Sequence, residues 1–93
     1  MATIDVQIEE QPQAYESTVT VTEDSTSTTH RITVNKEDYR RLTGGKADPE
    51  RLIEASFEFL LERESKESIL RSFNLMTISR YFPEYESQIG DLL

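Results

Sequence analysis

The fold is decided by residues 48–64, which read DPERLIEASFEFLLERE. Asp48 and Pro49 mark a helix start, because Asp accepts hydrogen bonds from the first amides and proline suits the first helical position. No Gly or Pro follows before Glu64. At about 100° per residue, the glutamates and Arg51 form one polar stripe, and the apolar residues fill a sector wider than one core-facing stripe. A helix of this kind needs cover on more than one side.

Three stretches upstream of this helix alternate between apolar and polar residues, which is typical of half-buried strands. The inward faces are expected to hold Ile4, Val6 and Ile8 in the first stretch, Val19 and Val21 in the second, and His30, Ile32 and Val34 in the third. A polar turn, DSTS at residues 24–27, predicts a hairpin near residues 15–34. We therefore predict a single α+β domain, residues 1–93, with a three-stranded antiparallel sheet in residues 1–35 covered by helices in residues 36–90.

The helical half has several start and stop signals. A short helix is expected between Asn35, which serves as its cap, and Gly44, which ends it. Asn74 resembles another helix cap. Ser65 either starts a new helix or interrupts the long one, so residues 49–72 are compatible with one helix or with two.

Composition limits the classes of function. The chain has 93 residues, 18 acidic and 10 basic side chains, a net charge of −8 and no Cys. This size predicts one domain, and the lack of Cys excludes disulfides and thiolate metal sites. The acidic balance repels phosphate backbones and anionic lipids, so we expect neither nucleic acid nor a membrane as partner. The opening residues have no basic or long apolar leader, and no apolar run reaches membrane length, so we expect a cytoplasmic protein.

Few residues are candidates for chemistry. His30 has neither a second His nor a Cys to form a metal site with it, and we expect a half-buried strand residue. The glutamates at spacing four, Glu50, Glu54, Glu58 and Glu62, are expected to form a solvated helix face. No phosphate loop, nucleophile elbow or dinucleotide motif is present. We predict no catalytic residues, no metal and no cofactor, and hence a protein that is not an enzyme.

Two stretches have the order of elements found in DNA-binding proteins. Residues 29–34, 36–43 and 49–64 resemble the strand and two helices of a ribbon-helix-helix repressor or antitoxin, in which a polar strand enters the major groove and the second helix builds a dimer. In this chain the resemblance implies DNA contacts by Thr29, Arg31, Thr33 and Arg40. Residues 67–82 resemble a helix-turn-helix.

A further resemblance covers residues 29–86. The run FEFLLERE at residues 57–64 is followed by SIL at residues 68–70, by Phe73 and Ile78, and by YFPEY at residues 81–85. These phrases resemble a group of small bacterial proteins of unknown function. The resemblance implies a compact bacterial protein and assigns no catalytic or binding residue.

The leading hypothesis is a non-enzymatic interaction or regulatory protein that self-associates through its helical half. It rests on apolar side chains of the helical half that one sheet would not cover. Apolar and aromatic side chains of this kind are enriched at the cores of protein interfaces. The expected interface residues are Ala55, Phe59, Tyr81, Phe82 and Tyr85. The expected partner is a protein, which includes a second copy of this chain in a homodimer. Two alternatives stay open: a ribbon-helix-helix or antitoxin-like DNA-binding regulator, and an acidic inhibitor that mimics nucleic acid through Asp5, Glu9, Glu16 and Glu23.

Overall fold

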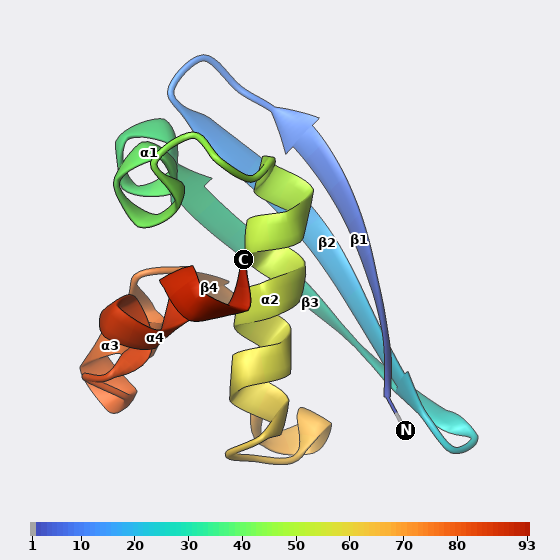
Figure 1. Ribbon diagram of the computed structural model, residues 1–93. Coiled ribbons are helices and arrows are strands. Elements are labelled where there is room, and N and C mark those ends of the chain that lie inside the picture. The colour runs from blue at the N-terminus through green and yellow to red at the C-terminus, as the bar shows by residue number, and fades with distance from the viewer. Residues whose placement is uncertain (1) are drawn as a thin grey trace.

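A four-stranded sheet carries helices on one face, which confirms the α+β architecture (Figure 1). The computed structural model describes residues 2–93. The strands are β1 (Thr3–Glu10), β2 (Ala14–Glu23), β3 (Thr26–Asn35) and β4 (Ser72–Asn74), in the spatial order β1-β2-β3-β4. The helices are α1 (Lys36–Thr43), α2 (Pro49–Leu61), α3 (Thr77–Tyr81) and α4 (Tyr85–Leu92), with a 3-10 turn, η1, at Lys66–Ser68.

The alternation in β1, β2 and β3 places the residues on the predicted faces. Val19 of β2 lies opposite Val6 of β1 and His30 of β3, and all three point toward the helices. The other face is polar and open to solvent. The β2–β3 turn is tighter than predicted, because Thr26 already belongs to β3. Asp24 takes the required positive φ of 58°, which Asp tolerates better than most residues.

The sheet has a fourth strand that the sequence did not predict. β4 runs parallel to β3, on the side away from β2. The amide of Arg31 donates to the carbonyl of Arg71 at 2.7 Å, and the amide of Leu75 donates to Thr33 at 2.8 Å. The prediction of three antiparallel strands, with helices alone in residues 36–90, is corrected in this detail. A strand of 3 residues is too short to show a two-residue alternation.

The predicted start and stop signals act at α1 and at the beginning of α2. Gly44 adopts the left-handed conformation, with φ 60°, and closes α1 by donating its amide to Arg40. Asp48 caps α2 by accepting from the amide of Arg51 at 3.1 Å. Asn35 stands at the cap position of α1, but its side chain makes no capping hydrogen bond.

Helix α2 ends at Leu61, earlier than the predicted limit at Glu64. In a continuing helix the carbonyl of Phe59 would accept from the amide of Arg63. That carbonyl instead accepts from the guanidinium of Arg63 at 3.0 Å, and the Arg63 amide turns to Leu60 at 2.9 Å. With 13 residues α2 is the longest helix of residues 2–93, in which no helix has the length and apolar character to cross a membrane.

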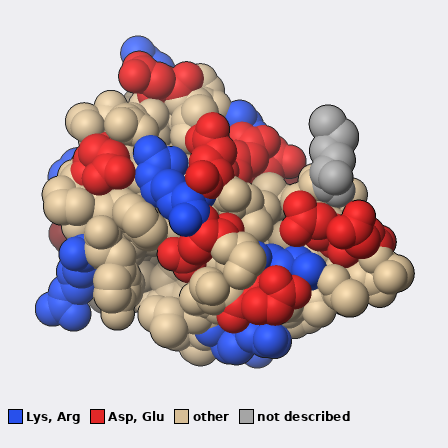
Figure 2. Space-filling model, turned by 90° about the horizontal axis from the view of Figure 1, so that it is seen from below, with Lys and Arg blue, Asp and Glu red and all other residues tan. Residues whose placement is uncertain are grey.

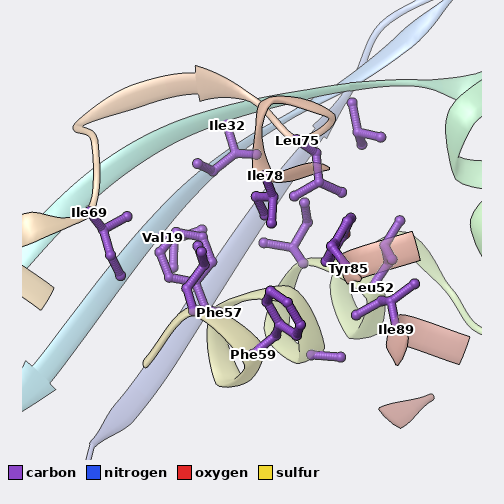
Figure 3. Packing of buried hydrophobic residues seen from close by; sticks show 14 of the residues in the cluster. Val19, Ile32, Leu52, Phe57, Phe59, Ile69, Leu75, Ile78, Tyr85 and Ile89 are labelled. Carbon is purple, nitrogen blue, oxygen red and sulfur yellow. The ribbon is translucent and has the colours of Figure 1, made fainter. Parts of the chain in front are cut away.

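The core lies between the sheet and α2 and continues under the C-terminal segment (Figure 3). Phe57 of α2 lies 5.3 Å from His30 and 6.3 Å from Phe73, measured between ring centroids. On its other side α2 contacts α4, where Tyr85 and Ile89 are fully buried. The sheet and the chain's own tail therefore supply the cover on two sides that the apolar width of α2 predicts.

Candidate functional site: an apolar groove beside strand β4

Three of the five predicted interface residues are buried within the chain. Ala55 and Tyr85 have no exposed surface, and Phe59 is 1% exposed. The ring of Phe59 packs edge-to-face on Tyr85 and on Phe82, with centroids 5.3 Å and 5.9 Å away. In this fold these residues are core residues, so the expectation that they form an intermolecular surface is corrected for Ala55, Phe59 and Tyr85.

Polar contacts hold the C-terminal segment on α2. The hydroxyl of Tyr85 lies 2.6 Å from that of Ser56, which in turn donates to the carbonyl of Leu52 at 2.8 Å. Burial, as the largest cause, raises the pKa of Tyr85 far above its usual range. The Arg63 guanidinium lies over the ring of Phe59 at 3.6 Å and also reaches α4. Phe82 packs on Phe59, lies 6.0 Å from the Arg63 guanidinium and stays partly exposed.

Two large apolar side chains, Tyr81 from the predicted set and Leu70 from outside it, are exposed and lie together. Leu70 is 48% exposed and Tyr81 is 67% exposed, and they are the exposed large hydrophobics of residues 2–93. Both line one hollow of about 210 Å³ between the end of α2, the segment before β4, and α3. We call this hollow the β4 groove. Its apolar walls are Leu60, Ile69, Phe73, Ile78 and Phe82.

The β4 groove contains one carboxylate, that of Glu64. Burial against the apolar walls raises the pKa of Glu64 above its usual value. Its side chain makes no ion pair or hydrogen bond with another residue of the described chain. The other polar residues of the lining are Ser68 and Thr77. The groove can therefore take an apolar group that carries a cation.

His30 lies behind this groove and fastens it to the sheet. Its Nδ1 is 2.8 Å from the carbonyl of Leu70, and its Nε2 is 2.8 Å from the hydroxyl of Thr28. A carbonyl only accepts, so Nδ1 donates and Nε2 accepts from Thr28 in the neutral ring. Burial, which outweighs the bond to Leu70, lowers the pKa of His30. The side chain is fully buried, where the sequence predicts half-burial, and both ring nitrogens are engaged.

The residues predicted to contact DNA lie on different surfaces. Thr29, Arg31 and Thr33 share the open face of the sheet, whereas Arg40 lies on α1. β3 pairs with β2 along its length and with β4 at Arg31–Thr33, so β4 occupies the part of the β3 edge that carries Arg31 and Thr33. Figure 2, seen from below the view of Figure 1, shows basic and acidic side chains interspersed. This geometry does not supply the surface that a ribbon-helix-helix dimer uses.

The resemblance of residues 67–82 to a helix-turn-helix is not borne out. That stretch contains the end of η1, an extended segment, β4 and the short helix α3. Asn74 belongs to β4, and its side chain accepts from the amide of Met76 at 2.9 Å. Residues 49–72 contain one α-helix, α2, followed by the 3-10 turn η1.

The glutamates at spacing four form a solvated face, as predicted: Glu50, Glu54 and Glu58 lie on α2, and Glu62 stands at its C-cap. The guanidinium of Arg51 bonds Glu54 at 2.8 Å and Glu58 at 3.4 Å, and it also reaches the carbonyl of Leu92 at 2.6 Å. Between residues 2 and 93 no three His, Cys, Asp or Glu side chains cluster in a way that could hold a metal ion.

Sequence analysis missed Leu70 and Glu64 as site residues. One signal for Leu70 was present. Ile69 and Leu70 are adjacent apolar residues, and neighbours in an extended segment point to opposite sides, so burying Ile69 exposes Leu70. Nothing in the local pattern marks Glu64, because its burial comes from residues of η1, β4 and α3.

Comparison of the chain with protein-family models, with curated proteins and with solved structures finds no match. The resemblance of residues 29–86 to small bacterial proteins therefore stays a prediction from the sequence.

Proposed function

We propose that this chain is a non-enzymatic interaction protein that binds an apolar, positively charged segment of another protein in the β4 groove. One observation carries the proposal. Leu70 and Tyr81, the exposed large hydrophobics of the described chain, converge on the same hollow. Solitary exposed apolar residues are ordinary, but a contiguous apolar patch with a polar rim marks an interaction site.

The size of the groove favours side chains of a protein over a small-molecule ligand. Pockets for drug-sized ligands and cofactors enclose roughly 300–1,000 Å³. The β4 groove measures about 210 Å³ and is open to solvent. It can hold a few apolar side chains of a bound segment, with Tyr81 as the aromatic contact at its rim.

Glu64 defines the charge of the expected partner. A carboxylate held against apolar walls is stabilised by a cation that arrives with the ligand, because the cation offsets the lost hydration. The net charge of −8 also attracts a basic partner at long range. We therefore expect a Lys or Arg next to the apolar residues of the bound segment.

The engagement of His30 supports a function without catalysis. A general base needs a ring nitrogen available to a substrate. Both nitrogens of His30 are used within the chain, at 2.8 Å each, and the ring is buried. Its role is to hold the segment that carries Leu70.

A selection of random peptides displayed on phage tests the proposal. We expect enriched peptides to combine large apolar residues with Lys or Arg, and to lose binding to a Leu70→Ser, Tyr81→Ser double variant. Arg80→Ala is the matched control, since Arg80 is exposed beside Tyr81 but outside the groove lining. Enriched peptides that bind the double variant and the control equally, or a selection without enrichment, would overturn it.

The other functions expected from the sequence have weaker support. Self-association through the helical half now depends on Tyr81 and Phe82, and light scattering over a dilution series tests it. For a DNA-binding regulator, the open face offers Arg31 in one hollow with Glu9 and Glu16, and Asp5 lies further along β1. Lack of retention on duplex DNA at low salt would end that alternative.

A further inference from the structure

Strand β1 is an open edge of the sheet. It pairs with β2 on one side, and no helix or strand of residues 2–93 lies beyond it on the other (Figure 1). At 8 residues it is long for an unprotected edge, and it contains no Pro, Lys or Arg. Natural proteins usually blunt such edges with Lys, Pro, bulges or a covering element, because the unpaired backbone is a template for another strand.

The hydrogen bonds show which amides face outward. The amide of Gln11 donates to the carbonyl of Ala14 at 2.8 Å, so this opposed pair is hydrogen-bonded. Hydrogen-bonded and non-bonded pairs alternate along an antiparallel ladder. The odd-numbered residues of β1 therefore bond to β2, and Ile4, Val6 and Ile8 point their amides and carbonyls away from the sheet. No other backbone hydrogen bond of residues 2–93 involves these outward groups.

The side chains at this edge are only half covered. Ile4, Val6 and Ile8 pack against the core on one side but stay partly exposed, unlike Val19 and Val21 of β2 and Ile32 and Val34 of β3. A hollow of about 350 Å³ lies where Ile4 and Val6 meet the first turns of α2. An added strand would place its own inward side chains there and complete the burial.

Charge identifies the strand that fits. Asp5 and Glu9 project on the open face of β1. Asp48, Glu50 and Glu54 border the hollow together with one cation, Arg51, which pairs with Glu54 at 2.8 Å, so the acids stay in excess. We propose that the β1 edge binds an extended segment of another protein, one that alternates apolar residues with Lys or Arg, as a fifth strand of the sheet. Its apolar side chains lie next to Ile4, Val6 and Ile8, and its cations lie opposite the acids.

A second copy of the chain fits this edge less well. In an antiparallel β1–β1 pair that matches Ile4 with Ile8 and Val6 with Val6, each Asp5 lies diagonal to Asp5 and Glu9 of the other copy. Diagonal neighbours are about 7–8 Å apart, close enough for like charges to repel. The acids therefore oppose self-pairing and favour a basic strand.

A designed peptide tests the proposal directly. The probe is a capped, fluorescent peptide of about ten residues that alternates Val and Lys, a length typical of a strand. One control replaces Lys by Glu. The second keeps every side chain but methylates the backbone amides along one edge, so that it retains the charge and cannot form the ladder. We expect the Lys peptide to bind, both controls to lose binding, and the amides of Ile4, Val6 and Ile8 to become protected from exchange.

Charge reversals on the protein sharpen the test. Asp5→Lys and Glu9→Lys should each weaken the Lys peptide by roughly twofold to fivefold, the range expected of cross-strand charge pairs. Glu37→Lys is the matched control, because it changes the net charge equally and lies on α1, away from the β1 edge in Figure 1. Equal weakening by all three variants, or unchanged binding of the methylated peptide, would show attraction by charge alone and overturn the proposal. A free protein that is already dimeric with these amides protected would also overturn it, in favour of a second copy.

Discussion

The two edges of the sheet are built in opposite ways. At one edge β3 pairs with the short strand β4, and the segment that follows folds back over α2 through Tyr85 and Ile89. At the other edge β1 has no neighbour and keeps its apolar side chains half exposed. At the covered edge the backbone of Arg31–Thr33 is paired with β4 and side chains are exposed in the β4 groove, whereas the open edge exposes backbone groups along β1.

This difference underlies the two modes of recognition that we propose for this chain. A groove selects a partner by the size and charge of its side chains, while an open edge selects any extended chain and relies on charge for specificity. The β3 edge is covered by β4 and the C-terminal segment, whereas no strand among residues 2–93 pairs with the outer side of β1. Substitutions at the two edges compare how much each edge contributes to the free energy of unfolding.

The largest effect is expected from Phe57→Ala. Phe57 is fully buried between His30 and Phe73 at the covered edge, so its loss leaves a cavity and should lower the free energy of unfolding by about 3–5 kcal/mol. Val6→Ala at the open edge removes half-buried methyl groups and should cost about 1 kcal/mol. Urea unfolding of both variants measures the difference. Equal costs would show that the two edges are packed alike. If Phe57→Ala does not fold, Phe57→Leu gives the same comparison on a smaller scale.

His30→Leu should cost about 2 kcal/mol at pH 7.5, because it leaves the carbonyl of Leu70 and the hydroxyl of Thr28 without their partner. The pKa of His30 is lowered in the folded state, mainly by burial, so the unfolded chain takes up the proton first. The wild type should therefore be most stable above about pH 6.5 and lose stability as the pH falls below that value. The variant should lack this loss between pH 7.5 and 5.5. The same pH dependence in both proteins would assign it to other groups.

Tyr85→Phe should lower the free energy of unfolding by about 1 kcal/mol. The change removes the bond to Ser56 but keeps the aromatic packing, and Ser56 still donates to the carbonyl of Leu52. Thermal unfolding followed by circular dichroism checks the value. A loss as large as that of Phe57→Ala would mean that the hydroxyl, rather than the ring, holds the C-terminal segment in place.

The smallest effect is expected from Ser17→Ala, between the two edges. Ser17 of β2 is 3% exposed, and its hydroxyl has no partner among residues 2–93. Removing an unsatisfied hydroxyl avoids its desolvation penalty, so the variant should match the wild type within about 0.5 kcal/mol or exceed it slightly. A loss of about 1 kcal/mol or more in urea unfolding would show that this hydroxyl is bonded.

Short sequence patterns predict much of the structure from β1 to the start of α2. Two-residue alternation places Val19, Val21 and Ile32 on the inward face, and the signals at Gly44 and Asp48 act where they were predicted. These features depend on neighbours within a few residues, so they can be read from short stretches.

The covered edge could not be predicted in the same way, because it depends on residues far apart in the chain. β4 is recognisable only beside the unpaired edge of β3, and the end of α2 follows from the Arg63 side chain. The apolar surplus on α2 was identified correctly, but the cover for Ala55 and Phe59 comes from within the chain. The groove at Leu70 and Glu64 could not be found before that cover was known.

Amide hydrogen exchange of the free protein at low concentration tests the contrast between the edges most directly. The account predicts that the outward amides of Ile4, Val6 and Ile8 exchange within the time of local fluctuations. It predicts that the amides of Arg31 and Leu75, which bond across the covered edge, exchange only as slowly as the whole chain unfolds. Slow exchange along β1, or fast exchange at Arg31, would contradict the account.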